Sequence, residues 1–208
     1  MASDISARTV LLQRGMRLEY LTIAWNVVEG LVAVASGAVS GSIALIGFGV
    51  DSFIETSSGA VLLWRLRAES RGHDAERVER TALKLVGVGF LLLAAYVAFD
   101  SVKSLIEREV PRRSIVGIAI AALSLIVMPW LAHAKRKAAG RLTSAALHAD
   151  SRQTSLCAYL SAILLGGLLL NALLGWWWAD PVAALCMVPI IVNEGREALR
   201  GETCSDCH

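Results

Sequence analysis

Residues 115–134, IVGIAIAALSLIVMPWLAHA, form an uninterrupted apolar stretch that decides the fold class. These twenty residues include no Asp, Glu, Lys or Arg. An α-helix needs about 20 mostly apolar residues to cross the hydrocarbon core of a bilayer. The stretch therefore predicts a membrane-spanning helix.

Similar stretches recur along the chain, and we expect six spans. Each should be a helix, because an open sheet cannot satisfy its backbone hydrogen bonds in lipid. The predicted fold is an all-α integral membrane protein, a six-transmembrane-helix bundle with tight links at residues 40–42 and 175–180. The spans are predicted at residues 18–39, 42–66, 81–105, 115–134, 142–174 and 181–199. The expected organisation is a cytoplasmic N-terminal segment (1–17), one transmembrane domain (18–199), a cytoplasmic Cys/His tail (200–208) and no cytoplasmic C-terminal domain.

Composition excludes several classes of protein. Only 18% of the 208 residues are charged, against about a quarter in soluble proteins, and six spans leave little room for a large catalytic domain. A net charge of +2 argues against a nucleic-acid partner. The chain has no metalloprotease, nucleophile-elbow or phosphate-loop motif. We expect neither an enzyme nor a covalently bound cofactor.

Basic residues set the orientation. If both termini are cytoplasmic, fifteen Lys and Arg residues fall on the cytoplasmic side, including Lys135 in a predicted polar loop at 135–141. Four fall outside, namely Lys103, Arg108, Arg112 and Arg113. The positive-inside rule therefore predicts an N-in, C-in, multi-pass protein of the cell membrane.

The second predicted span carries two carboxylates, Asp51 and Glu55. Residues four apart share one helix face, with about 5–6 Å between Cβ atoms. Two buried like charges repel each other unless one is protonated or a cation bridges them. A cation site is the favoured interpretation, and a protonated, hydrogen-bonded pair is the alternative.

The fifth predicted span carries a matching stripe of Asp150, Gln153 and Cys157. A carboxylate, an amide oxygen and a thiol together suit a divalent transition metal such as zinc. Individually, Cys157 could be a buried apolar residue and Gln153 an interhelical hydrogen-bond partner. Asp180 precedes Pro181 and is predicted to cap the N-terminus of the sixth span.

The sequence resembles the cation diffusion facilitator family, in a short, divergent form. The resemblance rests on Asn26, VSGSIAL (39–45), DSFIE (51–55), SAALHAD (144–150) and WWADPVAA (177–184). It implies a homodimer that exports zinc or related divalent cations as substrate, usually in exchange for protons. The family site takes two residues four apart in the second span and two four apart in the fifth, all His or Asp. Here these positions hold Asp51, Glu55, Gln153 and Cys157, so three of the four differ from the family, and Gln153 cannot exchange a proton.

Other residues are accessory candidates. Glu29 of the first span could relay protons, bind the ion or hydrogen-bond a neighbouring helix, and Asn26 one turn earlier is an accessory metal candidate. His148 could line an entry path. The tail contributes Cys204, Cys207 and His208, whose spacing matches the motif for haem attachment. The alternatives are that these residues capture a soft metal or that the tail has no role.

The resulting hypothesis is a membrane transporter that exports a divalent metal cation from the cytoplasm. The alternative is a membrane metal-binding or regulatory protein that holds the ion without moving it.

Overall fold

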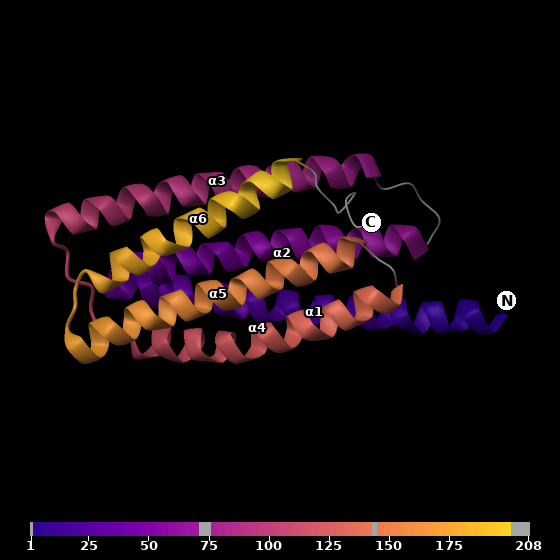
Figure 1. Cartoon of the computed structure of the whole chain (residues 1–208), viewed down its shortest axis with the longest axis horizontal. Helices are drawn as coiled ribbons and strands as arrows, with labels where there is room; N and C mark the ends of the chain where they lie inside the picture. The colour runs from indigo at the N-terminus through magenta and orange to yellow at the C-terminus, as the bar shows by residue number, and fades with distance from the viewer. Residues whose placement is uncertain (1, 71–75, 143–144, 201–208) are drawn as a thin grey trace.

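The computed structural model describes residues 2–70, 76–142 and 145–200, which fold into six helices running alternately in opposite directions (Figure 1). The helices are α1 (Ala2–Ser40), α2 (Ile43–Ser70), α3 (Glu76–Glu107), α4 (Ile115–Leu142), α5 (Ala145–Leu174) and α6 (Ala179–Arg200). The described ranges contain no strand. The predicted all-α bundle is confirmed.

Four of the described helices are long and apolar enough to cross a membrane by length and composition. The segments are Val10–Ser40, Lys84–Glu107, Ile115–Leu142 and Asp150–Leu174. α2 and α6 fall outside this group, although both were predicted as spans. Each carries two carboxylates that the bundle buries, so their polar positions face protein rather than lipid.

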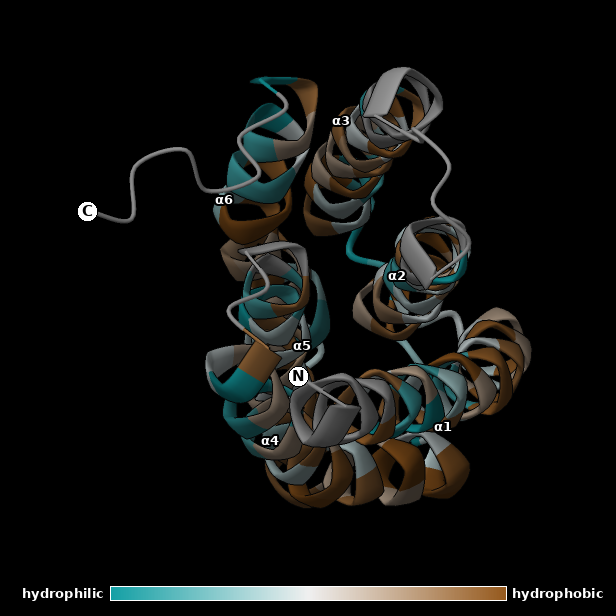
Figure 2. Cartoon of the chain, turned by 90° about the vertical axis from the view of Figure 1, so that its right-hand side faces the viewer, coloured by the Kyte–Doolittle hydropathy of each residue, from teal (hydrophilic) through white to brown (hydrophobic). Residues whose placement is uncertain are grey.

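The helices form three layers of two, visible along the bundle axis in Figure 2. α3 packs with α6, α1 packs with both α2 and α4, and α2 and α5 form the middle layer. The middle helices contact neighbours on both sides. This arrangement places the two predicted polar faces, on α2 and α5, inside the bundle.

The link between α1 and α2 is as tight as predicted. Gly41 has a φ of 73°, and the backbone nitrogens of Gly41 and Ser42 donate to the Gly37 carbonyl at 2.8 and 3.1 Å. A left-handed glycine that closes the last turn is a common helix C-cap. α2 therefore starts at once and packs antiparallel against α1.

Asp180 is a structural cap, but it caps α2 and not its own helix. Its Oδ2 accepts hydrogen bonds from the backbone nitrogens of Ile43 and Ala44 at 2.9 and 3.4 Å, and its Oδ1 accepts one from the Ser42 hydroxyl. α6 already begins at Ala179, so the Asp180 side chain is free to reach the neighbouring helix. A carboxylate at a helix N-terminus satisfies unpaired backbone donors and the helix dipole.

Several helices are longer than predicted. α1 begins at Ala2 instead of residue 18, and α4 continues to Leu142 instead of ending at residue 134. The predicted loop at residues 135–141 is wrong, because these residues form the last two turns of α4. Lys, Arg and Ala are good helix formers, so a helix can continue where its apolar stretch stops.

The first turn of α1 and the last turn of α6 lie at the same end of the bundle, here called the terminal end (Figure 1). The opposite end, with Gly41 and Gly175, is called the turn end. That the terminal end faces the cytoplasm stays a prediction from the basic residues. Lys135 leaves that count because its side chain is buried, and fourteen basic residues against four still favour this orientation.

Replacing Asp180 tests the cap between α6 and α2. Asp180→Ala removes three hydrogen bonds to the start of α2 and should lower the free energy of unfolding by about 1–3 kcal/mol. Asp180→Asn keeps acceptor oxygen and should cost less. Unfolding in detergent measures both. The control Asp100→Ala removes a residue that accepts one long hydrogen bond from Tyr96 on α3 and should change stability by under about 0.5 kcal/mol. Equal effects of Asp180→Ala and Asp100→Ala would contradict the cap.

Candidate functional site

The carboxylates of α2 point into the middle of the bundle. Asp51 and Glu55 are each only 3% exposed, as their spacing of one helical turn predicts. Asp51 Oδ1 and Glu55 Oε1 are buried and make no hydrogen bond within the described residues. Unpaired buried oxygens are costly, so these atoms are suited to bind a cation.

α1 adds a third carboxylate beside them. Glu29 is fully buried, and its Oε2 accepts a hydrogen bond from the Ser52 hydroxyl of α2 at 3.1 Å. Its Oε1 has no partner among the described residues, and neither does either atom of the buried Asn26 amide. The two accessory candidates of the first span therefore lie inside the bundle, and Glu29 is tied directly to α2.

α6 adds a fourth carboxylate, Glu194, which is 9% exposed and lies close enough to Asp51 and Glu55 for their charges to interact. Glu29, Asp51, Glu55 and Glu194 are called the acidic cluster below. The sequence prediction that Asp51 and Glu55 form a buried acidic pair was therefore incomplete. Three different helices supply carboxylates to this region.

The stripe predicted on α5 divides between different partners. Cys157 is 2% exposed and lies beside Glu55, so its thiol is next to the acidic cluster. Gln153 is half-buried, and its Oε1 accepts a hydrogen bond from the Ser58 hydroxyl of α2 at 3.2 Å. The structure thus places Cys157 beside Glu55, whereas the amide oxygen of Gln153 is hydrogen-bonded to Ser58.

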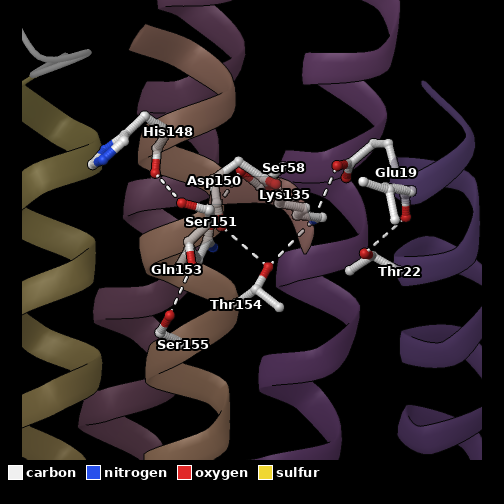
Figure 3. Close-up of polar contacts among 11 residues, drawn as sticks. Glu19, Thr22, Ser58, Lys135, His148, Asp150, Ser151, Gln153, Thr154 and Ser155 are labelled. Carbon is white, nitrogen blue, oxygen red and sulfur yellow. Dashed lines mark hydrogen bonds and ion pairs between the residues drawn. The ribbon is translucent and has the colours of Figure 1, made fainter. Parts of the chain in front are cut away.

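Asp150 is paired with a buried lysine. Lys135 Nζ of α4 donates to Asp150 Oδ2 at 2.6 Å and to Thr154 Oγ1 at 3.3 Å, and it forms an ion pair with Glu19 Oε2 of α1 at 2.9 Å (Figure 3). The Lys135 side chain is completely buried. Glu19, Lys135, Asp150 and Thr154 are called the lysine cluster below. Asp150 has a cationic partner in this structure, which the sequence prediction of a metal ligand did not include.

His148 lies apart from the contacts of the lysine cluster (Figure 3). The His148 side chain points away from Lys135, and its Nδ1 makes no hydrogen bond within the described residues (Figure 3). Cys204, Cys207 and His208 lie outside the described residues. Within the described ranges, no three His, Cys, Asp or Glu side chains converge closely enough to hold a metal ion.

Buried charge is strongly unbalanced. Among the side chains that the structure describes, the buried carboxylates are Glu19, Glu29, Asp51, Glu55, Asp150, Asp180 and Glu194. Lys135 is the one buried basic residue in the same set. Carboxylates inside a membrane protein are stable only when they are paired, protonated, hydrated or bound to a cation.

Sequence reasoning missed Glu19 and Lys135. Lys135 belongs to the run Lys135–Arg136–Lys137, which resembles a solvated loop, whereas only its first member faces the core. A signal was present, because Leu131, Lys135, Ala138 and Ala139 are buried at helical spacing. A basic residue on an apolar helix face predicts a buried acidic partner.

The chain matches the model of the cation efflux transmembrane domain over residues 20–202. It belongs to this family. The resemblance to cation diffusion facilitators found in the sequence is therefore confirmed, and the multi-pass membrane location follows from the family and the apolar helices.

Three similar proteins come from three different organisms. The chain is 26% identical over 169 residues to the uncharacterized transporter sll1263 of Synechocystis, covering 78% of this chain and 54% of that protein. It is 25% identical over 188 residues to transmembrane protein 163 of Xenopus laevis, covering 90% and 66%. It is 24% identical over 179 residues to the uncharacterized transporter MJ0449 of Methanocaldococcus jannaschii, covering 83% and 63%. The chain thus spans between about half and two thirds of the length of these relatives.

Replacing Lys135 tests the lysine cluster. Lys135→Ala leaves Glu19 and Asp150 buried without their cation and should lower the free energy of unfolding by about 3–5 kcal/mol. The double variant Glu19→Gln/Lys135→Met removes opposite charges together and should lose less. Lys137→Ala, at an exposed position two residues further along α4, is the matched control. If Lys135→Ala is as stable as Lys137→Ala in denaturant titrations, the buried pairing is wrong.

Proposed function

We propose that this protein exports a divalent transition metal cation, zinc or a similar ion, from the cytoplasm, and that the acidic face of α2 binds it. The observation that carries the proposal is the set of buried, unpartnered carboxylate oxygens on Glu29, Asp51 and Glu55. Membership of the cation efflux family and the transporter names of two relatives support the same interpretation.

Asp51 and Glu55 are the proposed main ligands, with Cys157 as a third. Carboxylate oxygen combined with thiolate favours zinc-like ions over magnesium or calcium. In this structure the Gln153 oxygen accepts a hydrogen bond from Ser58, and Asp150 Oδ2 is paired with Lys135. Because no three acidic, thiol or imidazole groups of the described residues converge, the proposal includes movement of these side chains toward the ion.

The counter-ion of the proposed cycle is the proton. When the metal leaves, the carboxylates of the acidic cluster regain their unbalanced charge, and protonation removes it. Gln153 replaces a titratable family residue, so fewer ligand positions can carry protons here than in the family pattern. A homodimer in the cell membrane, with the terminal end in the cytoplasm, completes the proposal.

Asp51→Ala tests the site. This variant removes a main ligand and should abolish metal-dependent flux in proteoliposomes loaded with zinc, iron, manganese or cobalt, while the protein stays folded in detergent. Asp100→Ala on α3, outside both clusters, should transport like the wild type. Full flux in Asp51→Ala would refute the assignment. Zinc binding without flux in the wild type would favour the alternative of a non-transporting metal-binding protein.

Cys157→Asp tests the metal preference. The substitution exchanges the one thiol beside Glu55 in the described region for a harder oxygen ligand. Relative flux should shift from zinc toward manganese, because oxygen ligands favour harder ions. Cys186→Ser is the control, because it replaces a thiol at an exposed position of α6 without adding a charge. It should leave selectivity unchanged. Unchanged selectivity in Cys157→Asp would mean that Cys157 only packs in the core.

A further inference from the structure

The lysine cluster already has the form of an occupied cation site. Three oxygen atoms, from Glu19, Asp150 and Thr154, surround the Lys135 ammonium at 2.9, 2.6 and 3.3 Å. They come from α1 and α5, while the ammonium comes from α4. All four side chains are buried. The cation held by this site belongs to the protein itself.

The lysine cluster and the acidic cluster are in electrostatic contact. Glu55 interacts with both Lys135 and Asp150, and it lies beside Thr154 as well as Cys157. Thr154, which accepts a hydrogen bond from Lys135, therefore lies between the two clusters. The charge of the ammonium therefore acts on Glu55, one of the proposed metal ligands.

The position of the lysine cluster places it on the terminal side of the acidic cluster. Lys135 is two turns from the end of α4, and Asp150 is between one and two turns from the start of α5. Both helix ends lie at the terminal end of the bundle (Figure 1). A cation that enters from this end meets Asp150 and Glu19 before it reaches Asp51.

We propose that Lys135 is a tethered cation that competes with the transported metal for the buried carboxylates. Without metal, the single positive charge of the ammonium is shared between Asp150 and Glu19 and partly offsets Glu55. When the metal binds, its charge replaces that of the ammonium near Glu55 and Asp150. When the metal leaves, the ammonium returns. The empty carrier therefore changes conformation with less unbalanced charge than it would have without Lys135.

Lysine suits this role better than arginine would. Its ammonium is a compact point charge on a flexible four-carbon stem, which can change partners over a short distance. Removing one partner of a buried ion pair is costly, so the ammonium moves only when another cation takes its place. This inference rests on the proposed function for its transport step but not for its binding step.

The binding experiment uses the full-length protein in detergent and zinc as the probe. Lys135→Met removes the competing charge, and zinc should bind about tenfold more tightly in calorimetric titration, a coupling of ordinary size. Lys137→Met should bind like the wild type. Unchanged or weaker zinc binding in Lys135→Met would overturn the proposal.

A second variant keeps this test decisive if Lys135→Met does not fold. Glu19→Gln/Lys135→Met removes one negative and one positive charge, so Asp150 is left without an ammonium and the net charge of the cluster is unchanged. Zinc binding should again be tighter than in the wild type. Wild-type affinity in this variant would overturn the competition.

Transport assays distinguish two roles of Lys135, neutralisation of charge in the empty carrier and simple repulsion between the ammonium and the metal. Net zinc flux requires the empty carrier to return, whereas exchange of labelled zinc at equal concentrations does not. Lys135→Met should lower net flux at least about tenfold and change exchange by less than about threefold. Equal losses in both assays would overturn the return role. If the wild type binds zinc but shows neither flux nor exchange, the proposed transport fails, while tighter binding by Lys135→Met still supports the competition.

Discussion

The structure depends on how it balances negative charge inside a membrane bundle. The described part of the chain buries seven carboxylates and one basic side chain. Each unpaired charge at this depth costs several kcal/mol, which is comparable to a large share of the stability of a domain. The fold is tenable only if the bundle supplies each carboxylate with a donor, a counter-ion or a proton.

The bundle supplies partners for the carboxylates toward its two ends, but not for all of the carboxylate oxygens in the middle. Toward the turn end, Asp180 is satisfied by the start of α2. Toward the terminal end, Lys135 forms ion pairs with Glu19 and Asp150. Between them lies the acidic cluster, where the Ser52 hydroxyl is one of few donors and several oxygens have no partner among the described residues. A cation that binds there would offset the charge of carboxylates that have no counter-ion of their own.

The layered arrangement explains why this cluster forms on α2. α2 is in the middle layer and packs against α1, α3, α5 and α6, so one side of it faces protein. Four other helices provide the long apolar segments, which allows α2 and α6 to carry carboxylates without exposing them to the hydrocarbon.

Sequence alone predicted the helices and the shared face of Asp51 and Glu55. The apolar stretch at 115–134 and the spacing of Asp51 and Glu55 each reflect a local periodicity, which sequence reports directly. The partners of Asp150, Gln153 and Asp180 depend on contacts between helices distant in sequence, and local patterns do not encode them. Lys135 was missed because hydropathy averages it with its exposed neighbours Arg136 and Lys137.

The most direct test of the account is X-ray absorption at the zinc edge on zinc-loaded protein that carries Cys204→Ser and Cys207→Ser. Zinc bound at the acidic cluster should show a shell of mainly oxygen ligands with one sulfur at about 2.3 Å, and that sulfur should be lost when Cys157→Ser is added. A shell without sulfur, or a sulfur signal that survives Cys157→Ser, would place the ion away from the acidic cluster and contradict the account.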